Sequence, residues 1–243
     1  MRGLLVVCLL VLATLVATAD VPAVSGAAAP ETARFEVTPV GALFDWDDGE
    51  LGEHYCTGSV VDSPAGNLIV TAAHCLDSSA AEDIAFVPGY HNGMAPYGIW
   101  TASQVIVDPR WSAAADPDFD IGFVVVGQAG NPRPIEAVTG ANRLATGRGF
   151  VNDVTLTGYP DDTDTPLIAH GRTTAADDHQ IKVDSPGFED GTSGSPWVLP
   201  GEPGTVIGVV GGYQLGGDEP DISYSTYFDD EIANLYRLAT STS

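Results

Sequence analysis

The sequence predicts an all-β fold with one helix at its C-terminus, and three observations lead to this prediction. The 243 residues include 28 glycines and 17 prolines, which favours short strands joined by turns over long helices. Seven short segments are rich in Val, Ile, Thr and aromatic residues and are bounded by Gly, Pro, Asn or Asp. Only the segment 227–239 has the apolar spacing of an amphipathic helix.

In chain order, the expected strands are 58–62, 67–73, 100–108, 120–127, 153–159, 205–213 and 222–228. Pro109 ends the third of them, because proline cannot donate a ladder hydrogen bond inside a sheet. In the expected helix, Phe228, Ile232 and Leu235 share a face, and the acidic residues 229–231 suit the positive end of the helix dipole. The Gly- and Pro-rich stretch 127–134 is a natural linker. We therefore expect a first β unit over 36–130 and a second, with the helix, over 131–243.

The N-terminus has the layout of a secretory signal peptide over residues 1–19. Arg2 precedes the apolar run 4–16, and small residues follow at 17–19. The alternative, an uncleaved membrane anchor, is disfavoured because the run is too short to span a bilayer comfortably. Residues 20–35 are expected to be a pro-segment or a flexible N-terminus, with cleavage near Ala19 or within 27–29. These features predict a secreted, extracellular protein.

Charge and cysteine content narrow the function further. The formal net charge is −24, from 33 acidic and nine basic residues. Such a chain repels phosphate backbones and anionic lipid, so we expect no nucleic-acid partner and no membrane partner after signal cleavage. Cys8 leaves with the signal, and the remaining pair, Cys56 and Cys75, predicts one disulfide in an oxidising compartment. A zinc site, the alternative, lacks enough clustered Cys and His ligands.

Three segments carry residues with catalytic chemistry. "TAAHC" places His74 beside Cys75, "DFDIG" places Asp120 at the start of an apolar strand, and "GTSGSPW" places Ser193 among glycines. A histidine in such a position is more often structural than catalytic when it stands alone. The chain order His, Asp, Ser excludes the α/β-hydrolase order, in which serine comes first, and the subtilisin order, in which the acid comes first.

These three segments resemble the signature segments of the trypsin/chymotrypsin superfamily, in the secreted bacterial branch that includes glutamyl-endopeptidase-like enzymes. The resemblance covers residues 36–238. It implies a chymotrypsin-like double six-stranded antiparallel β-barrel with a C-terminal helix. The implied activity is that of a secreted serine endopeptidase, which cleaves a polypeptide substrate through an acyl-enzyme. It implies no cofactor and no metal, and we expect a monomer.

The resemblance also implies a role for each residue of the site. His74 would be the general base, Asp120 its orienting acid and Ser193 the nucleophile, while the N–H groups of Gly191 and Ser193 would form the oxyanion hole. The disulfide Cys56–Cys75 would hold the histidine loop. Two rivals remain, Ser195 and Asp118. Ser195 is disfavoured because it precedes Pro196 and matches a usual glycine position, and Asp118 because the apolar strand begins directly after Asp120.

Specificity is left open by the sequence. The resemblance implies that the substrate-binding residues are Gly187, Gly211, Gly212 and Tyr213. Gly187 falls near the pocket aspartate of trypsins, and the segment 209–217 has no histidine like the one that reads an acidic side chain in glutamyl endopeptidases. Thr192 stands where digestive members carry an aspartate that pairs with a new N-terminal ammonium, so we do not expect activation through that ion pair.

Two other functions are considered, a catalytically silent binding protein on the same fold and a non-proteolytic serine acyl hydrolase. The silent protein is disfavoured because all three triad residues are present. The remaining histidines are expected at the surface or in loops; they are His54, His91, His170 and His179.

Overall fold

The fold is described from a computed structural model, which describes residues 38–77 and 80–243. All of these belong to one compact unit, Phe35–Ser243. The expected signal peptide, 1–19, and the expected segment 20–35 lie outside the described residues.

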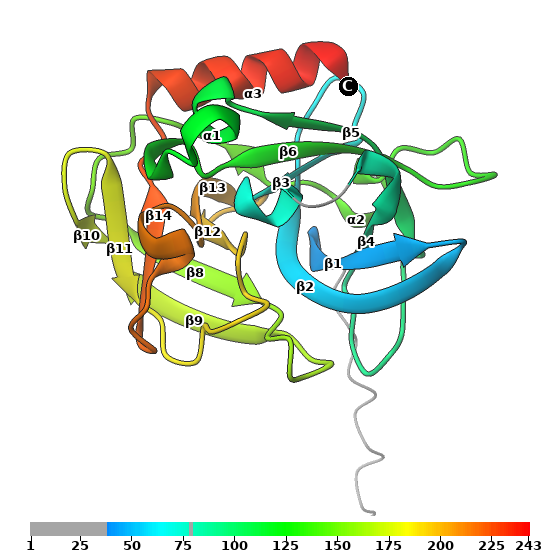
Figure 1. Cartoon of the computed structure of the whole chain (residues 1–243), viewed down its shortest axis with the longest axis horizontal. Helices are drawn as coiled ribbons and strands as arrows, with labels where there is room; N and C mark the ends of the chain where they lie inside the picture. The colour runs from blue at the N-terminus through cyan, green and yellow to red at the C-terminus, as the bar shows by residue number, and fades with distance from the viewer. Residues whose placement is uncertain (1–37, 78–79) are drawn as a thin grey trace, which may run out of the picture. The chain divides into compact units, whose positions relative to one another are not determined.

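The first half of the described chain forms a closed barrel of six antiparallel strands, in the order β1-β2-β3-β6-β5-β4 (Figure 1). Its strands are β1 (Val40–Asp47), β2 (Glu50–Val61), β3 (Leu68–Thr71), β4 (Ile84–Pro88), β5 (Trp100–Val107) and β6 (Gly122–Gly127). Every residue of β3 and β4 is buried, as are the first five of β6. These apolar runs fill the barrel interior and one outer face, which packs against the second half of the molecule.

The second half forms two sheets, one of five strands in the order β7-β13-β12-β8-β9 and one of three in the order β10-β11-β14. Its strands are β7 (Arg143–Leu144), β8 (Asp153–Gly158), β9 (Leu167–Arg172), β10 (Thr174–Ala175), β11 (Gln180–Asp184), β12 (Pro196–Leu199), β13 (Thr205–Val209) and β14 (Ile222–Thr226). A second closed six-stranded barrel was expected, and the described ladders leave it open. Between β13 and β14, Val209 N–H donates to the side-chain Oγ of Ser225 (3.0 Å), where a backbone ladder would use a carbonyl.

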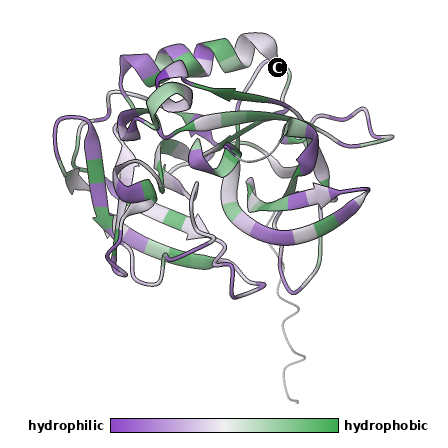
Figure 2. Cartoon of the chain, viewed as in Figure 1, coloured by the Kyte–Doolittle hydropathy of each residue, from purple (hydrophilic) through white to green (hydrophobic). Residues whose placement is uncertain are grey.

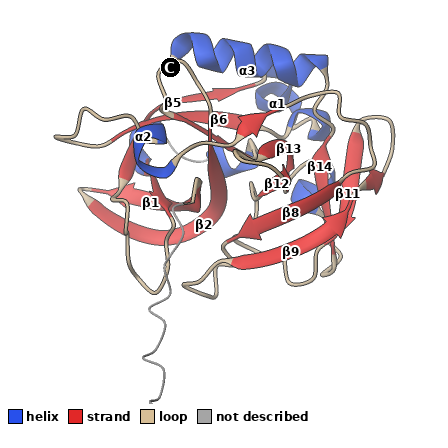
Figure 3. Cartoon of the chain, turned by 180° about the vertical axis from the view of Figure 1, so that it is seen from behind, coloured by secondary structure: helices blue, strands red, loops and turns tan. Residues whose placement is uncertain are grey.

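The described residues form few helices, and the longest of them lies at the C-terminus of the chain (Figure 3). They are α1 (Pro109–Ala114), α2 (Glu136–Thr139) and α3 (Asp230–Thr242), with the short 3-10 turns η1 (His74–Leu76), η2 (Ala81–Asp83), η3 (Pro117–Phe119) and η4 (Tyr213–Gly216). The Asp229 side chain caps α3 by accepting from Glu231 N–H and Ile232 N–H. Ile232, Leu235 and Ala239 bury the inner face of α3 against a core that includes Phe123 of β6.

The predicted all-β class is confirmed: six of the seven predicted strands contain an observed strand, and the seventh, 58–62, covers only the end of the longer strand β2. The predicted helix is also found, although it begins at Asp230 and runs to Thr242. Figure 2 shows hydrophobic residues along β5, and both hydrophobic and hydrophilic residues on α3. Pro109 does follow the end of β5, where it starts α1 behind the capping residue Asp108.

Among the described residues, no helix has the length and apolar character needed to cross a membrane.

Candidate active site

Strand pairing brings His74 and Asp120 to the same end of the first barrel. β3 and β6 are antiparallel neighbours in which Thr71 lies opposite Gly122. His74 follows Thr71 by three residues in the chain, and Asp120 precedes Gly122 by two. His74 and Asp120 therefore lie just beyond the same end of the β3–β6 pair, where their side chains contact each other.

Asp120 is fully buried, and its carboxylate accepts hydrogen bonds from three N–H groups. Oδ1 accepts from the backbone N–H of His74 (2.9 Å), and Oδ2 lies 2.8 Å from His74 Nδ1. Oδ2 also accepts from the backbone N–H of Gly212 (2.8 Å). This arrangement holds the imidazole ring with Nδ1 toward the acid, which leaves Nε2 for another partner.

The rival acid, Asp118, is engaged elsewhere. Its Oδ1 accepts from Gln180 Nε2 (2.9 Å), and among the described residues it makes no hydrogen bond to His74. The two candidates are two residues apart in the chain: Asp118 lies inside the turn η3 and Asp120 directly follows it, so this turn decides which carboxylate faces the imidazole.

Ser193 lies in the loop between β11 and β12, and backbone hydrogen bonds fix this loop to both halves of the fold. The carbonyl of Ser193 accepts from Thr57 N–H in β2 (2.7 Å), and Gly194 N–H donates to the carbonyl of Val210 (2.7 Å). Ser193 is partly exposed, and it lines the same two pockets as His74. No hydrogen bond joins the two side chains in the described part of the chain, although catalytic hydrogen bonds often tighten only when substrate binds.

The rival serine, Ser195, is fully buried, and its Oγ has no hydrogen-bond partner among the described residues. It lies against Gly158, where a Cβ on that glycine would collide with the Ser195 hydroxyl. A polypeptide substrate has no access to this oxygen.

The loop that carries Ser193 requires glycine at positions 191 and 194. Gly191 has φ +84°, and a Cβ there would collide with Asp161 N and Tyr159 O. Gly194 has φ +80°, and a Cβ there would collide with Thr71 Oγ1 and Thr57 O. Both positive φ values and both close approaches favour glycine over any L-residue.

The N–H groups of Gly191 and Ser193 donate no backbone hydrogen bond within the described ranges. The carbonyl that precedes Gly191, that of Asp190, is turned the other way and accepts from Asp161 N–H (3.0 Å). Thr192 is buried, and both its N–H (3.1 Å) and its Oγ1 (2.6 Å) donate to the carbonyl of Glu189. Internal hydrogen bonds thus hold this turn with two N–H donors unused.

Thr57 is a positioning residue that the sequence did not reveal. Its hydroxyl donates to the carbonyl of Gly191 (3.2 Å) and accepts from the N–H of Tyr159 (2.9 Å), while its backbone N–H donates to Ser193 O. Its own carbonyl accepts from Thr71 Oγ1 (2.7 Å). One buried side chain in the first barrel therefore ties the serine loop to Tyr159, which directly follows β8.

Thr57→Val removes this hydroxyl with little change of shape. We expect kcat to fall roughly 10- to 100-fold with KM nearly unchanged, because a slightly displaced turn misplaces reacting groups without removing substrate contacts. Steady-state kinetics on one peptide substrate measure both constants. Thr57→Ser keeps the hydroxyl and should retain most of the activity. An equal loss in both variants would contradict the role given to the hydroxyl.

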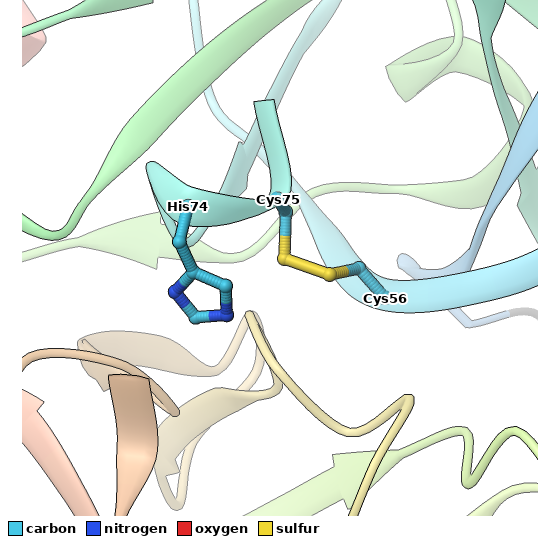
Figure 4. A group of neighbouring side chains, drawn as sticks. All are labelled: Cys56, His74 and Cys75. Atoms are coloured by element: carbon cyan, nitrogen blue, oxygen red, sulfur yellow. A yellow bond between two sulfur atoms is a disulfide. The ribbon is translucent and has the colours of Figure 1, made fainter. Parts of the chain in front are cut away.

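The predicted disulfide is present between Cys56 and Cys75, with a Cα–Cα distance of 6.2 Å. Figure 4 shows His74 next to this cross-link. Within the described residues, Cys56, His74 and Cys75 are also the one group of three or more His, Cys, Asp or Glu residues whose ligand atoms all lie within 4.8 Å of one another. Because a thiolate is the sulfur ligand of metals and both sulfurs are in the disulfide, this group does not form a metal centre.

Loss of the disulfide should lower the free energy of unfolding by about 3 kcal/mol, since it closes a loop with a sequence separation of 19. Urea unfolding of the oxidised and the reduced protein gives this difference. The Cys56→Ser/Cys75→Ser variant serves as the control, because reductant should leave its midpoint unchanged. Equal midpoints for oxidised and reduced wild-type protein would refute the expectation.

The residues expected to bind substrate lie at different positions relative to the pocket beside Ser193. The N–H groups of Gly211, Gly212 and Tyr213 are engaged within the protein, by Tyr224 O, Asp120 Oδ2 and Gln180 Oε1. Gly187 lines a separate pocket with Leu167. The wall beside Ser193 is formed instead by Phe188, Val210 and the segment 214–220. The sequence carried no periodic signal for this irregular segment.

Two of the histidines expected at the surface or in loops are buried. His54 lies in β2 and is 7% exposed, and His91 is 4% exposed, with Nδ1 2.7 Å from the carbonyl of Gly89. His170, on β9, and His179, in a bend, are both exposed, as expected. His54 is buried because Phe44 and Tyr90 pack against its ring.

The chain is similar to a known protein family and to several solved structures. Residues 56–209, which include His74, Asp120 and Ser193, match the family model of the trypsin-like peptidase domain. No curated protein matches the chain.

Solved structures share the fold. The protease Anisep from Arthrobacter nicotinovorans superposes with a TM-score of 0.73 at 24% identity, over 85% of this chain and 97% of that one. The thermostable serine protease AL20 from an extremophilic microorganism gives a TM-score of 0.73 at 22% identity, over 85% and 99%. A Glu endopeptidase gives 0.65 at 16% identity, over 84% and 91%. The closed barrel, the paired His74 and Asp120 and the match over more than half of its length show that this chain belongs to the trypsin-like peptidase family.

Proposed function

We propose that this protein is a secreted serine endopeptidase that cleaves polypeptides through an acyl-enzyme, with His74, Asp120 and Ser193 as its triad. One observation carries the proposal. The buried carboxylate of Asp120 is bound to Nδ1 of His74, and the ring of His74 shares its two pockets with Ser193. Few arrangements other than nucleophilic catalysis require a buried acid, an oriented imidazole and an accessible hydroxyl in one cleft.

In this mechanism, Ser193 Oγ attacks the carbonyl carbon of the scissile peptide while His74 Nε2 takes the hydroxyl proton. The imidazolium then donates Nδ1–H to Asp120, whose charge stabilises it. The peptide C–N bond breaks as His74 transfers the proton to the leaving amine. Water, deprotonated by the same imidazole, hydrolyses the ester and restores Ser193.

The oxyanion of each tetrahedral intermediate is assigned to the N–H groups of Gly191 and Ser193. Two facts support this role: neither N–H donates a backbone hydrogen bond within the described ranges, and the turn between them is held by Thr57 and Thr192. Because the donors are oriented before substrate arrives, they stabilise the developing charge without reorganisation. The same internal hydrogen bonds mean that a newly formed N-terminus is not needed to assemble the turn.

Secretion is part of the proposal. It rests on the disulfide Cys56–Cys75, which persists in oxidising compartments, and on the signal-like pattern of residues 1–19.

A fluorophosphonate probe tests the proposal directly, because its phosphorus atom reacts with a serine oxygen only when a base activates that oxygen and fluoride leaves. We expect a single label, mapped by peptide mass spectrometry to Ser193, and loss of labelling after His74→Gln. The variant Ser195→Ala should label like the wild-type protein. Label on Ser195 would contradict the assignment of Ser193 as the nucleophile. A folded protein that takes no label would favour the silent binding protein.

A peptide substrate distinguishes the remaining alternative. An endopeptidase releases two fragments from an internally quenched peptide, whereas a non-proteolytic acyl hydrolase turns over an activated ester and leaves the peptide intact. Ester turnover without peptide cleavage would replace the proposed activity with that of an acyl hydrolase.

A further inference from the structure

The cleft at Ser193 continues on both sides of that residue as one groove. A cavity of about 590 Å³ lies on one side and one of about 540 Å³ on the other. His74, Asp190 and Ser193 line both cavities, so the two meet at the candidate nucleophile. We call them the first and the second pocket of the groove. A groove with this form accepts an extended chain that passes across Ser193.

The first pocket combines an apolar wall with carboxylates. Phe188, Val210 and Leu215 supply the apolar surface. Four acidic side chains line the same pocket, all on exposed residues, and they are Glu189, Asp190, Asp218 and Glu219. A side chain that fits this lining has a long aliphatic stem and a positively charged end.

The second pocket is also acidic. Glu53 comes from β2, Asp161 from the loop after β8, and Asp190 from the serine loop. The tertiary fold therefore gathers these carboxylates from three separate segments of the chain. Asp190 faces both pockets, so the negative charge is continuous across the position of Ser193.

Two unpaired polar atoms lie beside the second pocket. His54 lines it and is 7% exposed, and its Nδ1 has no hydrogen-bond partner among the described residues. The buried hydroxyl of Tyr55, which lines the same pocket, likewise has none in the described ranges. Burial, with a smaller contribution from Asp45, raises the pKa of Tyr55 above its ordinary value, so this hydroxyl remains a donor. Both atoms lie in the wall of the second pocket and, like Ser195 Oγ, are shielded from solvent, so the contacts of the groove to a bound chain come from its exposed carboxylates.

Among residues 38–77 and 80–243, no lysine or arginine lines either pocket of the groove. The ion pairs among the described residues join His74 to Asp120, Arg110 to Asp108 and Glu231, and Arg172 to Asp153. None of them includes a carboxylate that lines the groove. Within the described part of the chain the six groove carboxylates thus form no ion pair, and they belong to a chain whose formal charge is −24.

We propose that the groove selects cationic polypeptides, with a lysine or arginine side chain in the first pocket and a further basic residue in the second. The proposal rests on the proposed endopeptidase function and specifies its substrate class. The aliphatic stem of the basic residue lies along Phe188, Val210 and Leu215, and its charged end meets the carboxylates. A glutamate in either pocket would bring like charges together, which costs affinity and slows association.

The recognition differs from a single buried acid at the base of a pocket. Each carboxylate here is solvent-exposed, and an exposed ion pair contributes little by itself. Selectivity therefore comes from several carboxylates acting together and from long-range attraction, both of which salt screens. Strong dependence on ionic strength is the signature that separates this device from one buried ion pair.

The test uses the full-length mature protein and a set of internally quenched peptides that differ at one position, with Lys, Arg, Gln, Leu or Glu before the scissile bond. At low salt we expect kcat/KM for Lys and Arg to exceed that for Glu by about 100-fold or more, with Gln and Leu between them. Raising the salt concentration should reduce the Lys-to-Glu ratio at least about 10-fold. A second basic residue after the scissile bond should raise kcat/KM further.

A matched pair of triple variants tests whether the groove carboxylates are responsible. Glu189→Gln/Asp218→Asn/Glu219→Gln neutralises the first pocket and should reduce the Lys-to-Glu ratio about 10-fold or more. Glu82→Gln/Asp178→Asn/Glu202→Gln makes the same three changes on exposed residues that line neither pocket, and it should leave the ratio within about twofold.

Fluorophosphonate labelling of Ser193 is measured in parallel, because the probe is uncharged and reports the nucleophile without the pockets. Labelled protein that prefers Glu or Leu would overturn the cationic substrate class. A Lys preference that survives the groove variant or high salt would overturn the role of these carboxylates. Absence of labelling would instead refute the proposed peptidase function itself.

Discussion

Ser193→Ala should lower kcat on a peptide substrate by roughly 10⁶-fold, the scale seen when a serine protease loses its nucleophile. The remaining rate comes from the oriented N–H groups and from substrate binding, which the substitution leaves in place. KM should change little, because the Ser193 hydroxyl contributes to the reaction and not to holding the substrate in the ground state. Steady-state kinetics at high enzyme concentration measure the residual turnover.

Ser195→Ala is the matched control for this experiment. It makes the same chemical change two residues away, on a hydroxyl that is fully buried and unpaired among the described residues. Removing an oxygen that has no partner leaves no other group unsatisfied, so activity should stay within a few-fold of wild type. A large loss in Ser195→Ala together with a small one in Ser193→Ala would reverse the assignment of the nucleophile.

Asp120→Asn should lower kcat by about 10⁴-fold while the protein stays folded. The carboxylate accepts from His74 N, His74 Nδ1 and Gly212 N, so both of its oxygens are acceptors. An asparagine replaces one acceptor with an N–H₂ donor, and the ring of His74 then favours the tautomer with its proton on Nε2. In that tautomer Nε2 cannot take the proton of Ser193, and no anion stabilises the imidazolium.

Asp118→Asn provides the matching control, because the Asp118 carboxylate accepts a hydrogen bond from Gln180, whereas that of Asp120 accepts from His74. We expect its kcat to remain within a few-fold of wild type. Circular dichroism and the urea midpoint of both variants show whether any loss comes from unfolding. Comparable losses for the two variants, or a fully active Asp120→Asn protein, would show that Asp120 does not orient the imidazole.

The sequence predicted the parts of the fold whose local pattern is strong. The segment 153–159 alternates apolar and polar residues, and it forms β8 with alternating burial. After Asp120, the segment 121–127 has no polar side chain, and it forms the buried strand β6. The strands β1, β4, β9, β11 and β12 were not predicted. In β9 the sequence "LIAHGR" mixes apolar, polar and glycine residues, and the strand is stabilised by its pairing with β8. The two-residue strands β7 and β10 are too short to carry any local pattern.

For the candidate site, the sequence by itself determined which kinds of residue are present, their chain order, and the glycines that the serine loop requires. His74, Asp120 and Ser193 could be selected because catalytic order and motif spacing are properties of the chain. Their joint geometry is a property of the fold. The turn η3 directs Asp120, and not Asp118, toward His74, and burial closes Ser195 to substrate.

Only the tertiary structure decided which residues support the turn and which line the groove. Thr57 and Gly191 are 134 residues apart in sequence, and their hydrogen bond exists because β2 and the serine loop pack together. Glu53, Asp161 and Asp190 likewise become one acidic surface only after three distant segments meet around Ser193. Local sequence records the propensity of each segment to form a strand, whereas the pairing of segments far apart in the chain depends on packing and burial that no short stretch of sequence contains.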